Sequence, residues 1–328
     1  MEWGMNKTTL EDNSGQAQPR SLLGFRMTDI AFGLGVIALV LLASFATDVF
    51  LTERNLVNVS RQMVTNGLLS IGMLIVILSG GIDLSVGSIA AFAGILATGL
   101  QSLMPLEFAI AIALSLGLAA GFINGVLVAY FRLQPFIVTL ATMGAIRGAI
   151  YIYSETPQYA SNEFFILVLG AGKLFGVVPA GFLIFCAFAL IVWFVLGHTR
   201  PGRAILAIGI NAEATRLAGI SVRHHIVGAY VASGFFAATA GILLAAKLGI
   251  SQPSVGVGYE LDAIAAVVIG GGILGGGGGT VMGMLGGVFA LAIIDNALNL
   301  FNVQSYYQQI VKGLIILVAV MARRKPKD

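Results

Sequence analysis

The stretch QMVTNGLLSIGMLIVILSGGI, residues 62–82, lies between Arg61 and Asp83 and contains no charged side chain. A helix needs about 20 mainly apolar residues to cross the roughly 30 Å hydrocarbon core of a bilayer, so this stretch is long enough to span one. Three similar uncharged runs lie at residues 30–46, 84–106 and 108–131. All four are apolar around the whole helix, whereas a helix of a soluble protein has an apolar stripe and a charged opposite face.

The composition of the chain agrees with a membrane protein. Of its 328 residues, 58% are hydrophobic and only 10% are charged, against about 25% charged in soluble domains. The runs do not alternate in polarity over segments of about ten residues, which disfavours an outer-membrane β-barrel. The sequence therefore predicts an all-α fold, a polytopic transmembrane helical bundle.

We predict about ten spans. Six follow the first four, at residues 133–153, 174–196, 226–246, 263 to the glycine cluster, 281–300 and 307–321. The glycines at 275–279 divide an uncharged stretch that is too long for one helix, because each glycine costs a helix about 1 kcal/mol. A different even number of spans, such as eight, is the alternative.

Lysine and arginine side chains near the span ends predict the orientation, because cytoplasmic loops carry an excess of both. With the N-terminus inside, twelve of the 18 basic residues fall on the cytoplasmic side: Lys7, Arg20, Arg26, Arg132, Arg200, Arg203, Arg216, Arg223, Arg323, Arg324, Lys325 and Lys327. Arg54 and Arg61 oppose the rule. We therefore predict two cytoplasmic termini, with a polar tail at 1–27, the membrane domain at 28–322 and a basic tail at 323–328.

The longest polar connection is HTRPGRAILAIGINAEATRLAGISVRHH, residues 198–225. Asn211 can cap a helix that begins at the next residue, with Glu213 in its first turn at the positive end of the helix dipole. Arg216 follows Glu213 by three residues on the same face, and Gly219 can end the helix. A helix of about two turns is not stable alone, so it is either an ordinary interfacial helix or a docking helix for a cytoplasmic partner.

Polar side chains also interrupt the apolar runs. In GGIDLSVGS, residues 80–88, Asp83 either caps a helix end or has a role in gating or packing beside a transport path, because ionisable groups at membrane depth tend to be functional. Further polar side chains within spans are Asn66, Asn124, Thr139, Thr142, Asn296 and Asn299. Each can join two helices by hydrogen bonds worth about 0.6–2 kcal/mol, or they can together line a polar path. Arg147 and Asp295 are the charged residues that we expect at membrane depth, where a charge is energetically unfavourable unless it is paired or solvated.

The sequence lacks the motifs of several other protein classes. It contains no phosphate loop of the form GxxxxGKS/T, no HExxH, no CxxC and no Cys/His cluster with metal-ligand spacing. The net charge is only +3, and the basic residues flank spans. We therefore expect no catalytic site, no metal site, no cofactor and no nucleic-acid partner.

Five motifs resemble one family. GGIDLSVGS, INGVLVAYFRLQPFIVTLATM at 123–143, AIGINAEATRLAGI at 207–220, GYELDAIAAVVIGG at 258–271 and YYQQIVKGLIILVAV at 306–320 are similar to the ribose-type sugar permeases of bacterial ABC importers, within the branched-chain amino acid/ribose permease superfamily. The resemblance implies a multi-pass subunit of the bacterial inner membrane, in contact with lipid. It also implies three kinds of partner: a cytoplasmic ATPase with two nucleotide-binding domains, a periplasmic sugar-binding protein, and a second copy or paralogue of the permease.

The resemblance also implies roles for particular residues. The stretch 207–220 corresponds to the coupling segment that contacts the ATPase, so that we assign coupling to Asn211, Glu213, Arg216 and Gly219. Candidate residues of the translocation path for a pentose or hexose are Asn66, Asp83, Ser85, Asn124, Phe136, Thr139 and Asn296. A permease for branched-chain amino acids or nucleosides, a secondary transporter that works without an ATPase, and a non-enzymatic scaffold are the alternatives.

Overall fold

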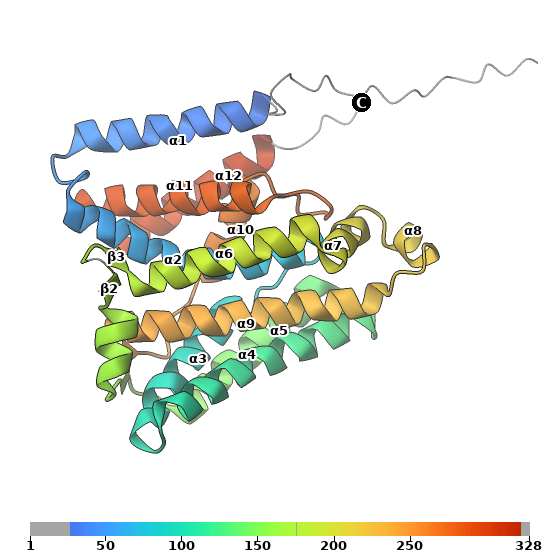
Figure 1. Ribbon diagram of the computed structural model, residues 1–328, viewed down its shortest axis with the longest axis horizontal. Helices are drawn as coiled ribbons and strands as arrows, with labels where there is room; N and C mark the ends of the chain where they lie inside the picture. Colours follow the sequence, from blue (N-terminus) through green and yellow to red (C-terminus); the bar gives the residue numbers. More distant parts are fainter. Residues whose placement is uncertain (1–26, 175, 323–328) are drawn as a thin grey trace, which may run out of the picture.

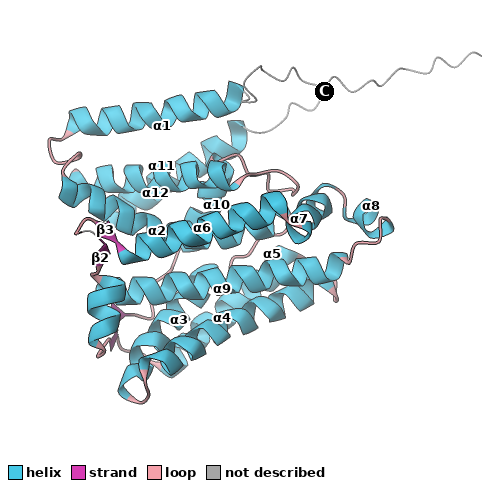
Figure 2. Cartoon of the chain, viewed as in Figure 1, coloured by secondary structure: helices cyan, strands magenta, loops and turns pink. Residues whose placement is uncertain are grey.

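The computed structural model describes residues 27–174 and 176–322, and nearly all of its regular structure is helical (Figure 2). The α-helices are α1 (Met27–Ala46), α2 (Glu53–Leu78), α3 (Val86–Gly99), α4 (Leu106–Ala129), α5 (Pro135–Tyr153), α6 (Ala180–His198), α7 (Arg200–Ile210), α8 (Ala212–Leu217), α9 (Val222–Leu248), α10 (Tyr259–Ile269), α11 (Val281–Leu300) and α12 (Ser305–Ala322). The shorter elements are η1 (Leu100–Ser102), the π-helix η2 (Phe164–Gly170), β1 (Gln158–Tyr159), β2 (Lys173–Leu174), β3 (Val178–Pro179) and β4 (Ile250–Ser251). Strand β1 pairs with β4, and β2 with β3, both antiparallel.

Six helices of the described residues are long and apolar enough to cross a membrane: α2, α4, α5, α6, α9 and α11. The predicted helical architecture is therefore confirmed, while the count of ten spans stays a prediction. The glycine cluster divides the chain as expected, because α10 ends at Ile269 and α11 begins at Val281. The predicted tails, apart from residue 27, lie outside the described residues.

The second half of the bundle repeats the first. Helices α2 to α5 and α9 to α12 share the order long, short, long, long, and α3 packs on α4 and α5 as α10 packs on α11 and α12. Helix α9 contacts α3 and α4, as α2 contacts α10 and α11 (Figure 1). Helices α2 and α9 are antiparallel, because Gly72 lies against Ser233 while Val64 and Leu243 line one pocket. The two halves therefore have opposite orientations, an arrangement common in transporters.

Helices α4 and α9 approach each other closely along a row of glycines. Gly117, Gly121 and Gly125 recur every four residues on one face of α4. A Cβ on Gly121 would overlap the carbonyl of Tyr230, and one on Gly125 would lie 2.7 Å from the Cα of Val227. Small residues at this spacing let helix backbones meet in a membrane, so this pair joins the first half of the bundle to the second.

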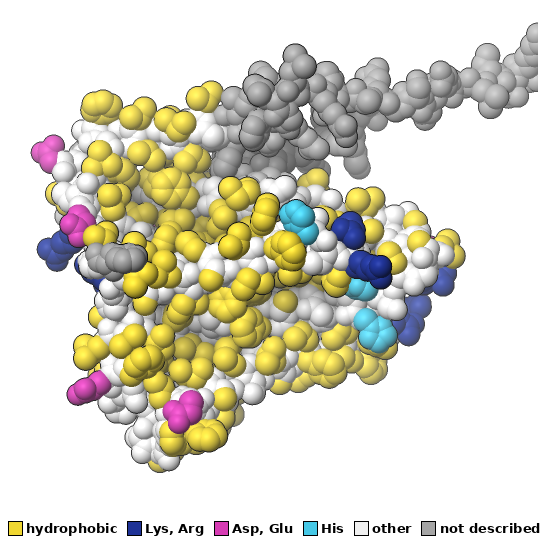
Figure 3. Space-filling model, viewed as in Figure 1, with side chains coloured by type: hydrophobic (Ala, Val, Ile, Leu, Met, Phe, Trp, Pro, Cys, Tyr) yellow, Lys and Arg dark blue, Asp and Glu magenta, His cyan; other side chains and the backbone are white. Residues whose placement is uncertain are grey.

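The outer surface is apolar where the bundle would meet lipid. Helices α4, α5 and α6 have most of their side chains outside the core, including Phe122, Ile152 and Leu190, which are exposed. Figure 3 shows hydrophobic side chains over most of the visible face, with charged ones confined to its two ends. A soluble monomer rarely exposes such a large apolar patch, so this surface fits a hydrocarbon environment.

Candidate functional site

The connection between α2 and α3, residues 79–85, holds a buried carboxyl group. Gly80, with a φ of +89°, turns the chain at a position where other residues would be strained. Asp83 follows and is fully buried. Its Oδ1 accepts hydrogen bonds from the Ser85 backbone N (3.0 Å) and Oγ (2.6 Å), and its Oδ2 accepts one from Ser233 Oγ of α9 (2.8 Å). Asp83 thus supports the first turn of α3 and also joins it to α9.

The hydrogen bonds continue from Ser85 into two more helices. Asn124 of α4 donates through Nδ2 to Ser85 Oγ (2.9 Å), and its Oδ1 accepts from Thr142 Oγ1 of α5 (2.6 Å). We call Asp83, Ser85, Asn124, Thr142 and Ser233 the Asp83 cluster. Bonds in such a chain polarise and strengthen one another in a low-dielectric interior, so the cluster fixes α3, α4, α5 and α9 relative to one another.

The structure brings only some of the seven candidate path residues together. Asp83, Ser85 and Asn124 belong to the cluster, and Thr139 lies beside it, donating to the carbonyls of Pro135 (2.9 Å) and Ile82 (3.4 Å). The other three, Asn66, Phe136 and Asn296, lie outside the cluster.

Asn296 of α11 exchanges two hydrogen bonds of 2.8 Å with Asn55 of α2, so its amide is used in helix pairing. Phe136 is 54% exposed on the surface of α5. Asn66 lies in the middle of α2 and is half-buried. Sequence reasoning missed Ser233 as a site residue, since a single serine in an apolar helix carries only a weak signal.

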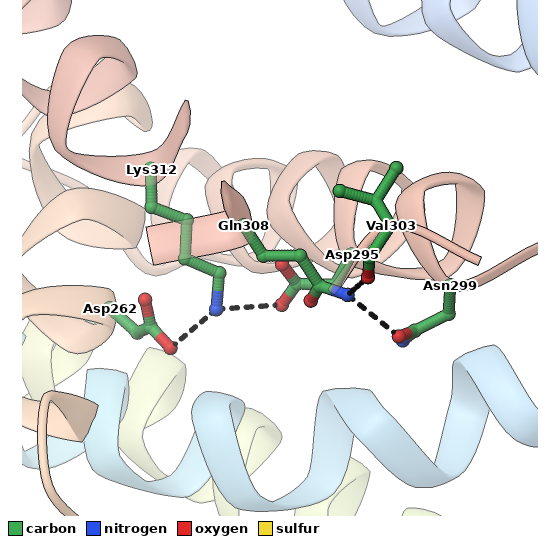
Figure 4. Close-up of polar contacts among 6 residues, drawn as sticks. All are labelled: Asp262, Asp295, Asn299, Val303, Gln308 and Lys312. Carbon is green, nitrogen blue, oxygen red and sulfur yellow. Dashed lines mark hydrogen bonds and ion pairs between the residues drawn. The ribbon is translucent and has the colours of Figure 1, made fainter. Parts of the chain in front are cut away.

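A second group of buried charges lies between α10, α11 and α12, and we call it the Lys312 triad (Figure 4). Lys312 Nζ lies 2.9 Å from Asp262 Oδ2 and 3.1 Å from Asp295 Oδ2. The expectation that Arg147 and Asp295 are the deep charges was incomplete, because Asp262 is also buried and the side chain of Lys312 is only 19% exposed. Charged side chains inside a membrane protein usually pair in this way, and the triad joins three helices of the second half.

Arg147 does not meet Asp295. It lies on α5 and donates from Nη1 to the carbonyls of Pro253 (2.6 Å) and Val255 (2.8 Å). These carbonyls belong to the connection between α9 and α10, residues 249–258. The guanidinium therefore fixes an irregular segment whose backbone oxygens would otherwise lack partners.

The segment 198–225 contains more helix than the sequence predicted. Helix α7 occupies Arg200–Ile210 before the predicted short helix, which the structure shows as α8. Asn211 caps α8 as expected, its Oδ1 accepting from Ala214 N (2.9 Å). Gly219, with a φ of +83°, follows the end of the helix. Helix α8 projects from one end of the bundle (Figure 1).

Most of α8 is open to solvent. Glu213 and Arg216 are both exposed and form an ion pair, with Arg216 Nε 2.9 Å and Nη2 2.5 Å from the carboxylate oxygens. The hydrogen bonds from Arg216 hold the pKa of the Glu213 carboxyl below its usual value. Leu217 is 72% exposed. An ionised pair beside an exposed leucine is a surface suited to a protein partner.

Basic side chains gather at the end of the bundle that carries α7 and α8 (Figure 3). Arg223, in the first turn of α9, lies over the ring of Tyr130 at 5.4 Å from its centroid. Tyr130 directly follows α4, and its hydroxyl oxygen lies 3.4 Å from His224 Nε2. The ends of α4 and α9 are thus joined beside α8.

Comparison with known proteins places these features in a family. A family model described as "Branched-chain amino acid transport system / permease component" matches residues 55–320. The chain belongs to this family. The match includes the Asp83 cluster, the Lys312 triad and α8, and it leaves α1 outside. No solved structure matches the chain.

Several sugar permeases resemble the chain over most of its length. The ribose import permease protein RbsC of Haemophilus influenzae is 40% identical over 294 residues, 88% of this chain and 91% of that protein. The RbsC of Bacillus subtilis is 40% identical over 295 residues, 89% of this chain and 91% of that protein. The L-arabinose transport system permease protein AraH of Escherichia coli K12 is 36% identical over 321 residues, 95% of each chain. The resemblance to ribose-type ABC permeases is therefore confirmed.

Proposed function

We propose that this chain is the membrane-spanning subunit of an ABC importer, forming the path by which a pentose or hexose crosses the bacterial inner membrane. A separate cytoplasmic ATPase drives transport, and a periplasmic binding protein delivers the sugar. The observation that carries this proposal is α8, an exposed capped helix with a paired Glu213 and Arg216, on a chain related to sugar permeases. A helix this short gains its order from what it packs against.

We also propose ten spans with both termini in the cytoplasm, formed by α1 to α6 and α9 to α12. Arg132, Arg216 and Arg223 support this orientation, since they lie at the α8 end and cytoplasmic loops favour basic residues. The binding protein would meet the opposite end. There Arg54, Arg61 and Lys173 line a cavity of about 610 Å³.

The substrate class follows from the relatives. RbsC and AraH are named for ribose and arabinose, which favours a sugar. The family description names branched-chain amino acids, so such a solute is the second candidate. A second copy of the chain, or a paralogue, would complete the transporter, as the resemblance implies.

Reconstitution tests the proposal. The chain alone in liposomes should neither hydrolyse ATP nor accumulate sugar, because it has no phosphate loop. With the ATPase and the sugar-binding protein of a related ribose or arabinose importer added, it should accumulate the labelled sugar in an ATP-dependent way. Uphill uptake by the chain alone, driven by an ion gradient, would contradict the proposal and support a secondary transporter.

Two substitutions test the coupling segment. Glu213→Ala removes the partner of Arg216, and Gly219→Val strains a left-handed backbone. Both should insert normally yet retain less ATPase in a pull-down and transport less sugar, with Gly219→Val the worse. Glu155→Ala, an exposed acid elsewhere, and Gly197→Val, where a Cβ has open space, are the controls. Normal binding and transport in both test variants would show that α8 is only an interfacial helix.

A further inference from the structure

The two irregular connections nearest to α7 touch each other. They are the 79–85 connection between α2 and α3 and the 270–280 connection between α10 and α11. Gly277 N donates a hydrogen bond of 3.1 Å to the carbonyl of Leu78, the last residue of α2. Gly80 Cα lies 3.0 Å from the place that a Cβ on Gly276 would take. The contact is thus backbone against backbone, without intervening side chains.

Helix α7 lies against both connections through Gly209. A Cβ on Gly209 would overlap the Leu78 carbonyl oxygen and the Gly277 nitrogen. In return, a Cβ on Gly276 would lie 2.7 Å from Gly209 O, and one on Gly277 would lie 2.5 Å from Ile210 Cγ1. At Gly209 the contact is backbone against backbone and has no flexible side chain to absorb a displacement, so movement of α7 must move both connections.

Helices α7 and α8 are joined without a linker. Asn211 is both the C-cap residue of α7 and the N-cap residue of α8. Its N donates to the Ala207 carbonyl (3.0 Å), and its carbonyl accepts from Thr215 N (3.0 Å) and Thr215 Oγ1 (2.8 Å). These bonds fix the angle between the two helices, so a partner that displaces exposed α8 also displaces α7.

We propose that α7 is the lever that transmits movement of α8 to the transport path, and that Gly209 is the contact at which this movement enters both connections. The inference rests on the proposed function and names the positioning residue within it. The 79–85 connection contains Asp83, whose hydrogen bonds to Ser85 and Ser233 lead on to α4, α5 and α9. A displacement at Gly209 therefore reaches α3, which begins after Ser85, as well as α4, α5 and α9.

Gly209→Ala tests the lever. Non-bonded carbon atoms are most stable about 3.5–4.0 Å apart, so the added methyl must push α7 away from Leu78 and Gly277. Gly197→Ala, in α6, is the matched control, because it makes the same change in a helix where a Cβ meets nothing within 4 Å. Each variant is purified with the ATPase and reconstituted, and sugar uptake and ATP hydrolysis are measured together.

The expected result is specific to coupling. Gly209→Ala should still bind the ATPase, yet sugar moved per ATP hydrolysed should fall by about fivefold or more, the lower end of the range usual for coupling between sites. Hydrolysis should also lose its response to the loaded binding protein. Gly197→Ala should match the wild type on both counts. A variant that only unfolded would lose ATPase binding as well.

Hydrogen–deuterium exchange on the wild-type complex gives a test that does not depend on a variant folding. Trapping the ATPase with a non-hydrolysable ATP analogue should change the protection of residues 79–85 and 270–280 together. Residues 117–125, in the close contact between α4 and α9, should change less and serve as the internal control.

The outcomes separate this inference from the proposed function. Normal coupling in Gly209→Ala, or unchanged exchange at both connections in a complex that does transport sugar, would overturn the lever and leave the importer standing. Failure of the wild-type chain to bind any ATPase would overturn the proposed function, and the lever with it.

Discussion

Asp83 is the residue whose replacement should distinguish hydrogen bonding from charge. Asp83→Ala removes the acceptor of three hydrogen bonds, two from Ser85 and one from Ser233. Each such bond contributes about 1 kcal/mol net, and a buried donor left unpaired costs about 1–3 kcal/mol. The two hydroxyl bonds account for about 1 kcal/mol each, and the Ser85 N–H, which cannot turn to another acceptor, for about 1–3 kcal/mol. We therefore expect Asp83→Ala to lower the free energy of unfolding by about 3–5 kcal/mol.

Asp83→Asn keeps the shape and most of the bonds. Its side-chain oxygen can accept from Ser85, and its NH₂ can donate to the hydroxyl of Ser233, which rotates to become the acceptor. Only the extra strength of hydrogen bonds to a charged group is lost, so Asp83→Asn should lower the free energy of unfolding by about 1 kcal/mol. Ser233→Ala removes one bond and should cost about 1–2 kcal/mol.

Unfolding titrations in mixed detergent micelles, combined with uptake assays, measure both effects. Asp48→Ala, which changes an exposed carboxylate between α1 and α2, is the control and should stay within about 0.5 kcal/mol of the wild type. An Asp83→Asn variant as unstable as Asp83→Ala would refute the reasoning from hydrogen bonds. A stable Asp83→Asn variant that fails to transport would show instead that the negative charge acts in gating.

Three further sets of substitutions test the packing, the buried charges and the topology. Gly121→Ala should destabilise the bundle by about 1–3 kcal/mol through overlap with α9, whereas Gly148→Ala, which has open space, should not; thermal unfolding measures both. Lys312→Met should lower the free energy of unfolding by about 3–5 kcal/mol, because it leaves the largely buried carboxylates of Asp262 and Asp295 unpaired. Asp295→Asn should lower it by only about 1 kcal/mol, since Lys312 keeps its ion pair with Asp262. Unfolding titrations in micelles compare the two variants. Leu217→Cys, in a background without the native cysteine, should react only with membrane-permeant reagents, and labelling from the periplasm would contradict the proposed orientation.

The sequence predicted the helices better than their ends. The uncharged run at 62–82 located a span, yet α2 begins at Glu53. Hydropathy reports the part of a helix that matches hydrocarbon, whereas the helix itself continues through Arg54 and Arg61 to its cap. That cap is Thr52, whose hydroxyl accepts from the Asn55 N–H (3.4 Å), and a local signal of this kind is easily overlooked beside a long apolar run.

Polar residues in apolar runs were recognised as candidates, but their partners were not. A buried polar group must find a partner, so the residue types alone predict that Asp83 and Asn124 make hydrogen bonds. Which groups they meet depends on how helices far apart in the sequence pack. Ser233, 150 positions from Asp83, could not be paired with it from one sequence. Lys312 was overlooked because a single lysine near the start of a predicted span resembles an ordinary flanking charge.

The two connections beside α7 are held in place by different kinds of hydrogen bond. Asp83 anchors the 79–85 connection to α9 through a side-chain bond. The 270–280 connection is held instead by backbone bonds, from Ile273 N to Gly278 O (2.9 Å) and from Gly277 N to Leu78 O (3.1 Å). Glycine offers no side chain to anchor and permits many backbone conformations. The position of the second connection therefore depends on α2 and α7, and the glycine cluster, read from sequence only as a helix breaker, is also what lets these backbones meet.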